Sequence, residues 1–207
     1  AYSPEELYVR RYLKNEIHYV FVNVFVASNL VRILYLTTEL IDMDYRMVIA
    51  LNMFDELEQS GGKIDYKHLG NMIGVPIVPT VSRSGKGVNQ LFDTIIEVYE
   101  GRDESVRHVH VGLGKVIENS ITPLKDLLKK DPTCKREFSP RYLAIKILEG
   151  DTEVKRMLEG SESYPELMNI RNAEVEKIET TLNEDIESAI ANEKYGFISG
   201  ALAETYR

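Results

Sequence analysis

The segment Tyr19–Val26 reads Tyr-Val-Phe-Val-Asn-Val-Phe-Val, an almost unbroken run of β-branched and aromatic side chains. Such a run is typical of a strand that is buried in a parallel sheet. Two shorter apolar runs follow, at Met47–Leu51 and Val75–Val81, and each of the three runs leads into a helical pattern. Strands that alternate with helices predict a doubly wound parallel sheet of the α/β class. The helices expected between and after these strands span Leu30–Ile41, Asp65–Ile73 and Val88–Tyr99.

The sequence changes character after Gly101, where residues 102–107 are charged and loop-like. Beyond this boundary only helices are predicted, so we expect an α/β domain over residues 1–101 and an all-α domain over residues 102–207. The longest expected helix runs from Pro165 to Ala191, because apolar residues recur along it every three to five positions. The remaining helices are expected at Ser3–Asn15, Val116–Lys130, Ser139–Leu148, Thr152–Leu158 and Asn192–Thr205.

Composition and charge narrow the class of function. The 207 residues carry a net charge of −8, which argues against nucleic acid as a partner. No apolar stretch approaches the roughly 20 residues that a membrane-spanning helix needs. The single cysteine, Cys134, excludes an internal disulfide and fits a reducing cytoplasm. The first residue is not Met, so we expect this soluble chain to be part of a longer protein.

Polar segments follow all three predicted strands, at the edge where doubly wound sheets bind ligands. The second segment, Asn52-Met53-Phe54-Asp55, has the pattern Asn-x-x-Asp directly after a buried strand. Guanine presents two parallel donors that one carboxylate accepts together, so Asp55 is expected to select guanine over adenine. Asn52 is expected to tie the neighbouring loops together. The other two segments are 27–29 and 82–84, and the latter would offer a backbone N–H of Ser82-Arg83 to the guanine oxygen.

A structural interpretation of these residues stays open, since Asn and Asp often only turn the chain after a strand. Gly85-Lys86-Gly87 lacks the spacing of a Walker loop and is expected to be a flexible lead into a helix. His108 and His110 have no evident third metal ligand. The acidic residues between Glu174 and Glu187 are expected to form a solvated helix face. No catalytic residue and no metal site is predicted.

Several blocks of the sequence resemble the cytoplasmic region of the FeoB family of ferrous-iron transporters. The resemblance is carried by Ala27-Ser28-Asn29-Leu30, by Ala50-Leu51-Asn52-Met53-Phe54-Asp55 and by Gly74-Val75-Pro76-Ile77-Val78-Pro79-Thr80. It continues in the helical part with Ser139-Pro140-Arg141-Tyr142 and Tyr195-Gly196-Phe197-Ile198, and it extends over essentially the whole chain.

The resemblance implies a partial P-loop-GTPase-like sheet followed by a helical, GDI-like domain that tunes nucleotide affinity. Asn52, Met53, Phe54 and Asp55 would form the guanine-specificity motif for GTP or GDP. Val81, Ser82 and Arg83 would take the place of the fifth nucleotide motif. The parent protein would hydrolyse GTP and pass ferrous iron through its own membrane domain, at the cytoplasmic face of a bacterial or archaeal membrane. A homo-oligomer is compatible with this assignment.

The resemblance also implies missing parts. In the family, the Walker loop, the first switch and the magnesium ligands precede the position of Ala1, so this chain alone is expected to be inactive as a GTPase. Three apolar residues, Val26, Val31 and Ile33, stand where the family usually has Asp, Glu and Asn. Two alternatives remain: a non-enzymatic helical interaction module, and another small GTPase such as a ribosome-assembly factor.

Overall fold

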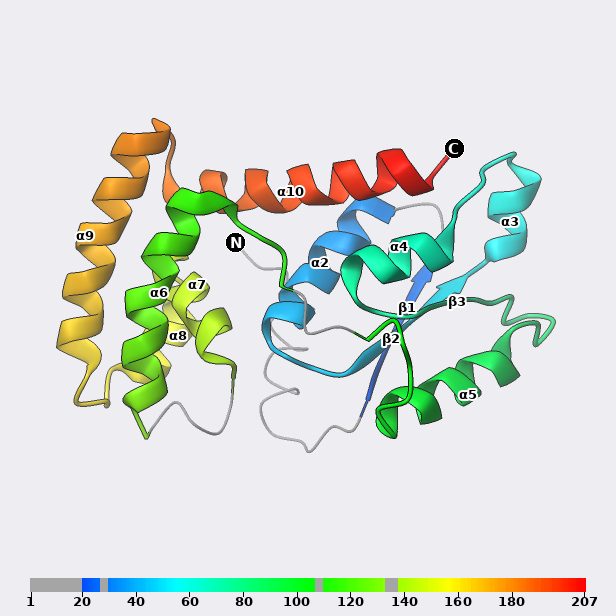
Figure 1. Ribbon diagram of the computed structural model, residues 1–207, viewed down its shortest axis with the longest axis horizontal. Helices are drawn as coiled ribbons and strands as arrows, with labels where there is room; N and C mark the ends of the chain where they lie inside the picture. The colour runs from blue at the N-terminus through cyan, green and yellow to red at the C-terminus, as the bar shows by residue number, and fades with distance from the viewer. Residues whose placement is uncertain (1–19, 27–29, 107–109, 133–137) are drawn as a thin grey trace. The chain divides into compact units, whose positions relative to one another are not determined.

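The computed structural model describes residues 20–26, 30–106, 110–132 and 138–207. The predicted helix Ser3–Asn15, the segment 27–29, His108 and Cys134 lie outside the described residues. By their contacts the residues form two compact units. The first unit holds the described residues up to 30, together with 45–106 and 205–207, and the second holds 31–44 and 110–204. Figure 1 labels the helices and strands of both units.

The first unit is built on a three-stranded parallel sheet in the order β1-β2-β3. The strands are β1 (Phe21–Val26), β2 (Met47–Asn52) and β3 (Ile77–Pro79). Strand β2 lies in the middle, and its residues from Met47 to Leu51 are all buried. The doubly wound parallel sheet predicted from the sequence is therefore confirmed in the described residues. The register pairs β1 with β2 from Phe21 opposite Met47 to Val26 opposite Asn52.

Helices α4 (Tyr66–Ile73) and α5 (Val88–Tyr99) cover this sheet. Helix α4 begins where the side chain of Asp65 accepts a hydrogen bond from the His68 N–H, and it ends at Gly74 in the left-handed conformation. Helix α5 buries Val98 against Val48 and Val78 of the sheet. Both helices have the positions that their apolar periodicity predicts.

One side of β1 is left uncovered in the described residues. The register places Val22, Val24 and Val26 of β1 on the same face of the sheet as Val48 and Ala50 of β2. The β2 residues on this face are buried, whereas all three valines are exposed, Val24 to 63%. β1 is also an edge strand, because within the described residues it pairs only with β2.

The second unit is helical. In its core, every residue of α7 from Tyr142 to Leu148 is buried. The neighbouring helices α6 and α9 each bury one face in this core. No helix among the described residues is both long enough and apolar enough to cross a bilayer. The helices that contribute to this unit are α2 (Leu30–Asp42), α6 (Gly114–Lys130), α7 (Pro140–Glu149), α8 (Thr152–Leu158), α9 (Tyr164–Leu182) and α10 (Ile186–Thr205).

The single long helix predicted from Pro165 to Ala191 is wrong. The chain forms two helices here, and they are separated at Asn183, whose φ of 54° lies in the left-handed region. Asn tolerates this conformation and ends helices for that reason. Asp185 then starts α10, because its side chain accepts a hydrogen bond from the Ser188 N–H at 2.9 Å. The helix expected at Asn192–Thr205 is the second part of α10.

Candidate functional site

Asn52 links the ends of β2 and β3. Its side-chain oxygen accepts hydrogen bonds from the Ser82 N–H at 3.0 Å, from the Ser82 hydroxyl at 2.8 Å and from the Thr80 hydroxyl at 3.3 Å. Thr80 also accepts a bond from the Phe54 N–H through its carbonyl oxygen. The polar segments after two neighbouring strands are therefore joined, as the sequence predicts for Asn52. Thr80 is a member of this network that sequence reasoning missed, although it directly precedes the predicted Val81-Ser82-Arg83.

The residues after Asn52 turn sharply into a short helix, α3 (Phe54–Gln59), which is not among the helices predicted from the sequence. Met53 has a φ of 55° and a ψ of 35°. This is the left-handed backbone conformation, which residues other than Gly, Asn and Asp rarely adopt. The Met53 carbonyl oxygen accepts the N–H of Glu56, which closes the first turn of α3. This turn places Asp55 in the first turn of a helix, directly beyond the end of β2.

The loop after β3 is closed on itself. Val81 is buried and forms an antiparallel bridge with Lys86, and the Val81 N–H donates to the Lys86 carbonyl at 3.0 Å. Gly87 follows with a φ of 79°, and a Cβ at this position would lie 2.2 Å from the Pro79 carbonyl oxygen. Only glycine fits there. Gly85-Lys86-Gly87 is thus part of a hydrogen-bonded turn beside Ser82, and it leads directly into α5 at Val88, as predicted.

Arg83 and Asp55 meet at this edge. The Arg83 guanidinium lies 3.8 Å from the Asp55 carboxylate; the Arg83 side chain is exposed, whereas that of Asp55 is partly buried. The Ser82 N–H is donated to Asn52, which leaves the Arg83 N–H as the candidate donor of the predicted pair Ser82-Arg83. A carboxylate and a backbone donor on adjacent loops form a pair that complements a base with donors and an acceptor on one edge.

The described residues hold no group of three or more His, Cys, Asp or Glu side chains placed to bind a metal ion. His110 instead lies 3.8 Å from the Asp42 carboxylate in the second unit. Burial and the nearby Arg141 lower the pKa of His110 below its ordinary value, so the neutral imidazole is favoured.

A cluster of buried charges in the second unit has a structural role. Lys146 of α7 lies 2.6 Å from the Glu39 carboxylate of α2, and Lys194 of α10 lies 3.6 Å from the Asp42 carboxylate. Arg141 also contacts Asp42, at 3.4 Å. Burial raises the pKa of Asp42, and the neighbouring Lys194 and Arg141 oppose this effect. Each buried carboxylate has a cation beside it, and the cluster fixes α2 among the helices of its unit.

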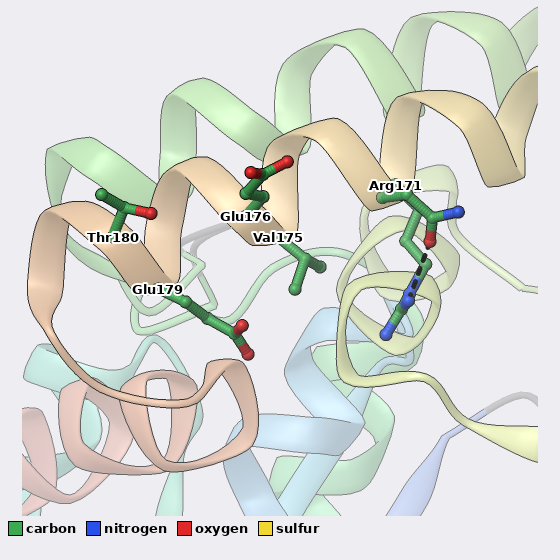
Figure 2. A pocket seen from close by; sticks show the side chains of 6 residues that line it. Arg171, Val175, Glu176, Glu179 and Thr180 are labelled. Carbon is green, nitrogen blue, oxygen red and sulfur yellow. Dashed lines mark hydrogen bonds between the residues drawn. The ribbon is translucent and has the colours of Figure 1, made fainter.

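A surface hollow of about 380 Å³ lies along α9, and Figure 2 shows the labelled side chains Arg171, Val175, Glu176, Glu179 and Thr180 around it. Several polar side chains that line the hollow already form hydrogen bonds within the helical unit. The Arg171 guanidinium donates to the Ile147 carbonyl at 3.0 Å, and the Glu179 carboxylate accepts the Ile186 N–H at 3.1 Å. The acidic residues of α9 around the hollow thus behave as a helix surface, and the edge near Asn52 is the better candidate site.

Comparison with known proteins gives consistent matches for both parts of the chain. Residues 1–95 match the family described as ferrous iron transport protein B, and residues 114–207 match the family described as the FeoB cytosolic helical domain. The chain is 42% identical, over 209 aligned residues, to the Fe(2+) transport protein A/Fe(2+) transporter FeoB fusion protein of Porphyromonas gingivalis. The alignment includes the whole of this chain and 25% of the length of that relative.

Two solved structures extend the similarity to the fold. A GDP-bound mutant of S. thermophilus NFeoB is 31% identical with a TM-score of 0.84, and this chain covers 76% of it. The mGMPPNP-bound NFeoB of S. thermophilus is 32% identical with a TM-score of 0.81, and this chain covers 73% of it. The chain spans about a quarter of the length of the curated relatives it matches. Sequence and fold agree in both parts of the molecule, and the chain belongs to the FeoB family, where it corresponds to the cytosolic region.

Proposed function

We propose that the α/β part of this chain, residues 1–101, recognises the base of GTP or GDP in a protein that couples GTP hydrolysis to the uptake of ferrous iron. The observation that carries this proposal is the hydrogen bonding of Asn52 to Ser82, which joins the two loops that bear Asp55 and Arg83. Solved relatives with this fold are described as bound to GDP and to mGMPPNP, which supports a guanine nucleotide as the ligand.

Each part of the site would have a distinct task. The Asp55 carboxylate would accept the ring N–H and the amino group of guanine, and the Arg83 N–H would donate to the guanine oxygen. Asn52 and Ser82 would hold these groups at a fixed separation. Met53 and Phe54 would set the turn that orients Asp55, and buried Val81 would anchor the loop that carries Arg83. Adenine has neither the donor pair nor the oxygen, so it would be rejected.

The phosphates would be held by a segment that precedes this one in the family and carries the Walker loop and the magnesium ligands. Among the described residues, β1 pairs with β2 alone and Val22, Val24 and Val26 are exposed. This supports the proposal, because one further strand and its helix would pair with that edge and cover the three valines. Groups that bind magnesium and the γ-phosphate supply most of the catalysis in such sites. The chain by itself would therefore not turn over GTP.

The helical unit, which holds 31–44 and 110–204, would tune nucleotide affinity and connect the nucleotide site to a membrane domain at the cytoplasmic face of the cell membrane. The relatives' descriptions as Fe(2+) transporters support iron as the cargo of the whole protein. Iron would then be a partner of the membrane domain and would not be bound by this chain.

Competition binding tests the proposal. Labelled GDP bound to the protein that includes its phosphate-binding half should be displaced by GTP and GDP but not by ADP. A phosphate-release assay on the 207-residue chain alone should show no magnesium-dependent turnover. Equal displacement by ADP would contradict the assignment of the base site, and turnover by the chain alone would show that its phosphate site lies elsewhere.

A further inference from the structure

Two segments far apart in the sequence, Lys63–Asp65 and Thr205–Arg207, pair in the first unit, and together they are named the clasp. An antiparallel bridge joins Ile64 to Tyr206. The Lys63 N–H donates to the Arg207 carbonyl at 2.7 Å, and the Arg207 N–H donates to the Lys63 carbonyl at 2.8 Å. The Asp65 N–H donates to the Thr205 carbonyl at 2.7 Å. In Figure 1 the labelled C-terminus lies near the segment that joins α3 to α4.

The first half of the clasp is attached to the end of α3. The Gly62 N–H donates to the Leu57 carbonyl at 3.1 Å, so the residue before Lys63 is bonded directly to the helix that carries Asp55. The packing there is tight, because a Cβ on Gly62 would lie 2.8 Å from Leu57 and 3.3 Å from the Tyr206 hydroxyl. Leu57 is buried. One side of α3 is therefore packed near the clasp.

A second contact reaches the beginning of α3. Tyr66 directly follows the clasp, and its ring packs edge-on against Phe54 with 6.0 Å between the ring centroids. Phe54 is the residue immediately before Asp55. Helix α3 has only six residues, too few to be stable without such contacts. Besides the bond from the Phe54 N–H to Thr80, its position therefore depends on Gly62 and Tyr66, which flank Lys63–Asp65.

We propose that Thr205–Arg207 are positioning residues for guanine recognition. By pairing with Lys63–Asp65 they hold α3 in the orientation in which the Asp55 carboxylate meets both donors of the base. Thr205 is also the last residue of α10, so the end of that helix is joined by hydrogen bonds to the segment that supports the base site. This inference rests on the proposed function. Linkage requires that a base bound to Asp55 in turn stabilises the clasp.

Two substitutions at one position test the clasp. Arg207→Pro removes the N–H that bonds to Lys63, whereas Arg207→Ala keeps the backbone and removes only the side chain. The readout is the ratio of the affinities for GDP and for inosine diphosphate, which lacks the amino group that Asp55 would accept. The protein used includes its phosphate-binding half, at a temperature where both variants are folded by circular dichroism. We expect Arg207→Pro to lower this ratio roughly two- to tenfold, the scale of one net hydrogen bond, and Arg207→Ala to change it less than about twofold.

If the clasp only stabilises the fold, Arg207→Pro will have a lower melting temperature and an unchanged ratio of the two affinities. That result would overturn the inference. Hydrogen exchange on the unmodified protein gives an independent test. GDP should slow exchange at the amides of Lys63 and Asp65 relative to the same concentration of ADP, and protection of α3 without protection of these amides would also overturn it. Failure of the unmodified protein to prefer GDP over ADP would overturn the proposed function as well.

Discussion

Ser82 donates both its backbone N–H and its hydroxyl group to the side-chain oxygen of Asn52, at 3.0 and 2.8 Å. The two residues are 30 positions apart in the sequence, and they follow neighbouring strands of the sheet. An acceptor with two donors from one residue fixes the distance between the two loops more closely than a single bond does. The separation of Asp55 from the Arg83 N–H is therefore set before any ligand binds, which lowers the ordering cost of binding.

Ser82→Ala tests this contact. The substitution removes the hydroxyl bond to Asn52 and keeps the backbone bond, so GDP binding should weaken by about 0.5–1 kcal/mol, the lower range for a net hydrogen bond. Isothermal titration in the protein with its phosphate-binding half measures the change. Ser84→Ala is the matched control, because the Ser84 hydroxyl bonds to the Val81 carbonyl and not to Asn52. Equal effects of the two substitutions would show that the Asn52 contact has no special importance.

Two glycines of the same loop separate backbone strain from steric overlap. Gly85 and Gly87 both have positive φ, but a Cβ on Gly85 meets nothing within 4 Å, whereas a Cβ on Gly87 meets the Pro79 carbonyl. Gly85→Ala should cost about 1–2 kcal/mol of stability from the left-handed conformation alone. Gly87→Ala should cost about 1–3 kcal/mol more, since the backbone around Pro79 must shift. Urea unfolding of the two variants measures the difference, and equal costs would refute the close approach.

The break between α9 and α10 changes which side chains matter in the helical unit. Ile178 is fully buried at 0% exposure, whereas Leu182, near the end of α9, is 37% exposed. Ile178→Ala should therefore destabilise the protein by about 2–5 kcal/mol. Leu182→Ala should change its stability by about 0.5 kcal/mol or less. A large loss for Leu182→Ala would instead support a single helix from Pro165 to Ala191 whose apolar residues are buried together.

Acid should weaken the helical unit through Glu118. Its carboxylate accepts two bonds of 2.7 Å from the Arg141 guanidinium, and these bonds hold the pKa of Glu118 below its ordinary value of 4.5. The unfolded chain therefore binds the proton at a higher pH than the folded chain does. The stabilisation is complete above pH 4.5 and is lost as the pH falls below it toward the folded pKa. Glu118→Gln should lower stability at pH 7 and flatten its decline in acid, as denaturant unfolding at several pH values would show. Parallel declines in the two proteins would contradict this role.

The sequence predicted much of this architecture because its signals are local and strong. The run Met47–Leu51 has the continuous apolar pattern of a central strand, and Asp65 and Gly74 mark the ends of α4 by their capping chemistry. The joining of the loops by Asn52 was also predicted, because its side-chain amide carries both donors and an acceptor and lies at a strand end.

The missed features depend on conformation or on distant contacts. Helix α3 has six residues, which is too short for a periodic pattern, and the left-handed Met53 before it is not a residue type that signals such a turn. Asn183 and Asp185 are residue types that commonly end and begin helices, and they mark the break between α9 and α10. The apolar spacing continues through them, however, and favoured the prediction of a single helix. Nothing local in Lys63–Asp65 or Thr205–Arg207 predicts the clasp, since backbone pairing across the chain uses no particular side chains.

The central claim is that Asp55 reads guanine, and exchanging its carboxylate for an amide tests it most directly. Asp55→Asn places a donor where the carboxylate would accept the guanine amino group. In the protein with its phosphate-binding half, GDP binding should weaken by about 2–3 kcal/mol, the scale of a lost hydrogen bond to a charged group. Xanthosine diphosphate has an acceptor in place of that amino group, so it should bind Asp55→Asn more tightly than it binds the unmodified protein. Unchanged GDP affinity in Asp55→Asn, with no gain for xanthosine diphosphate, would contradict the account.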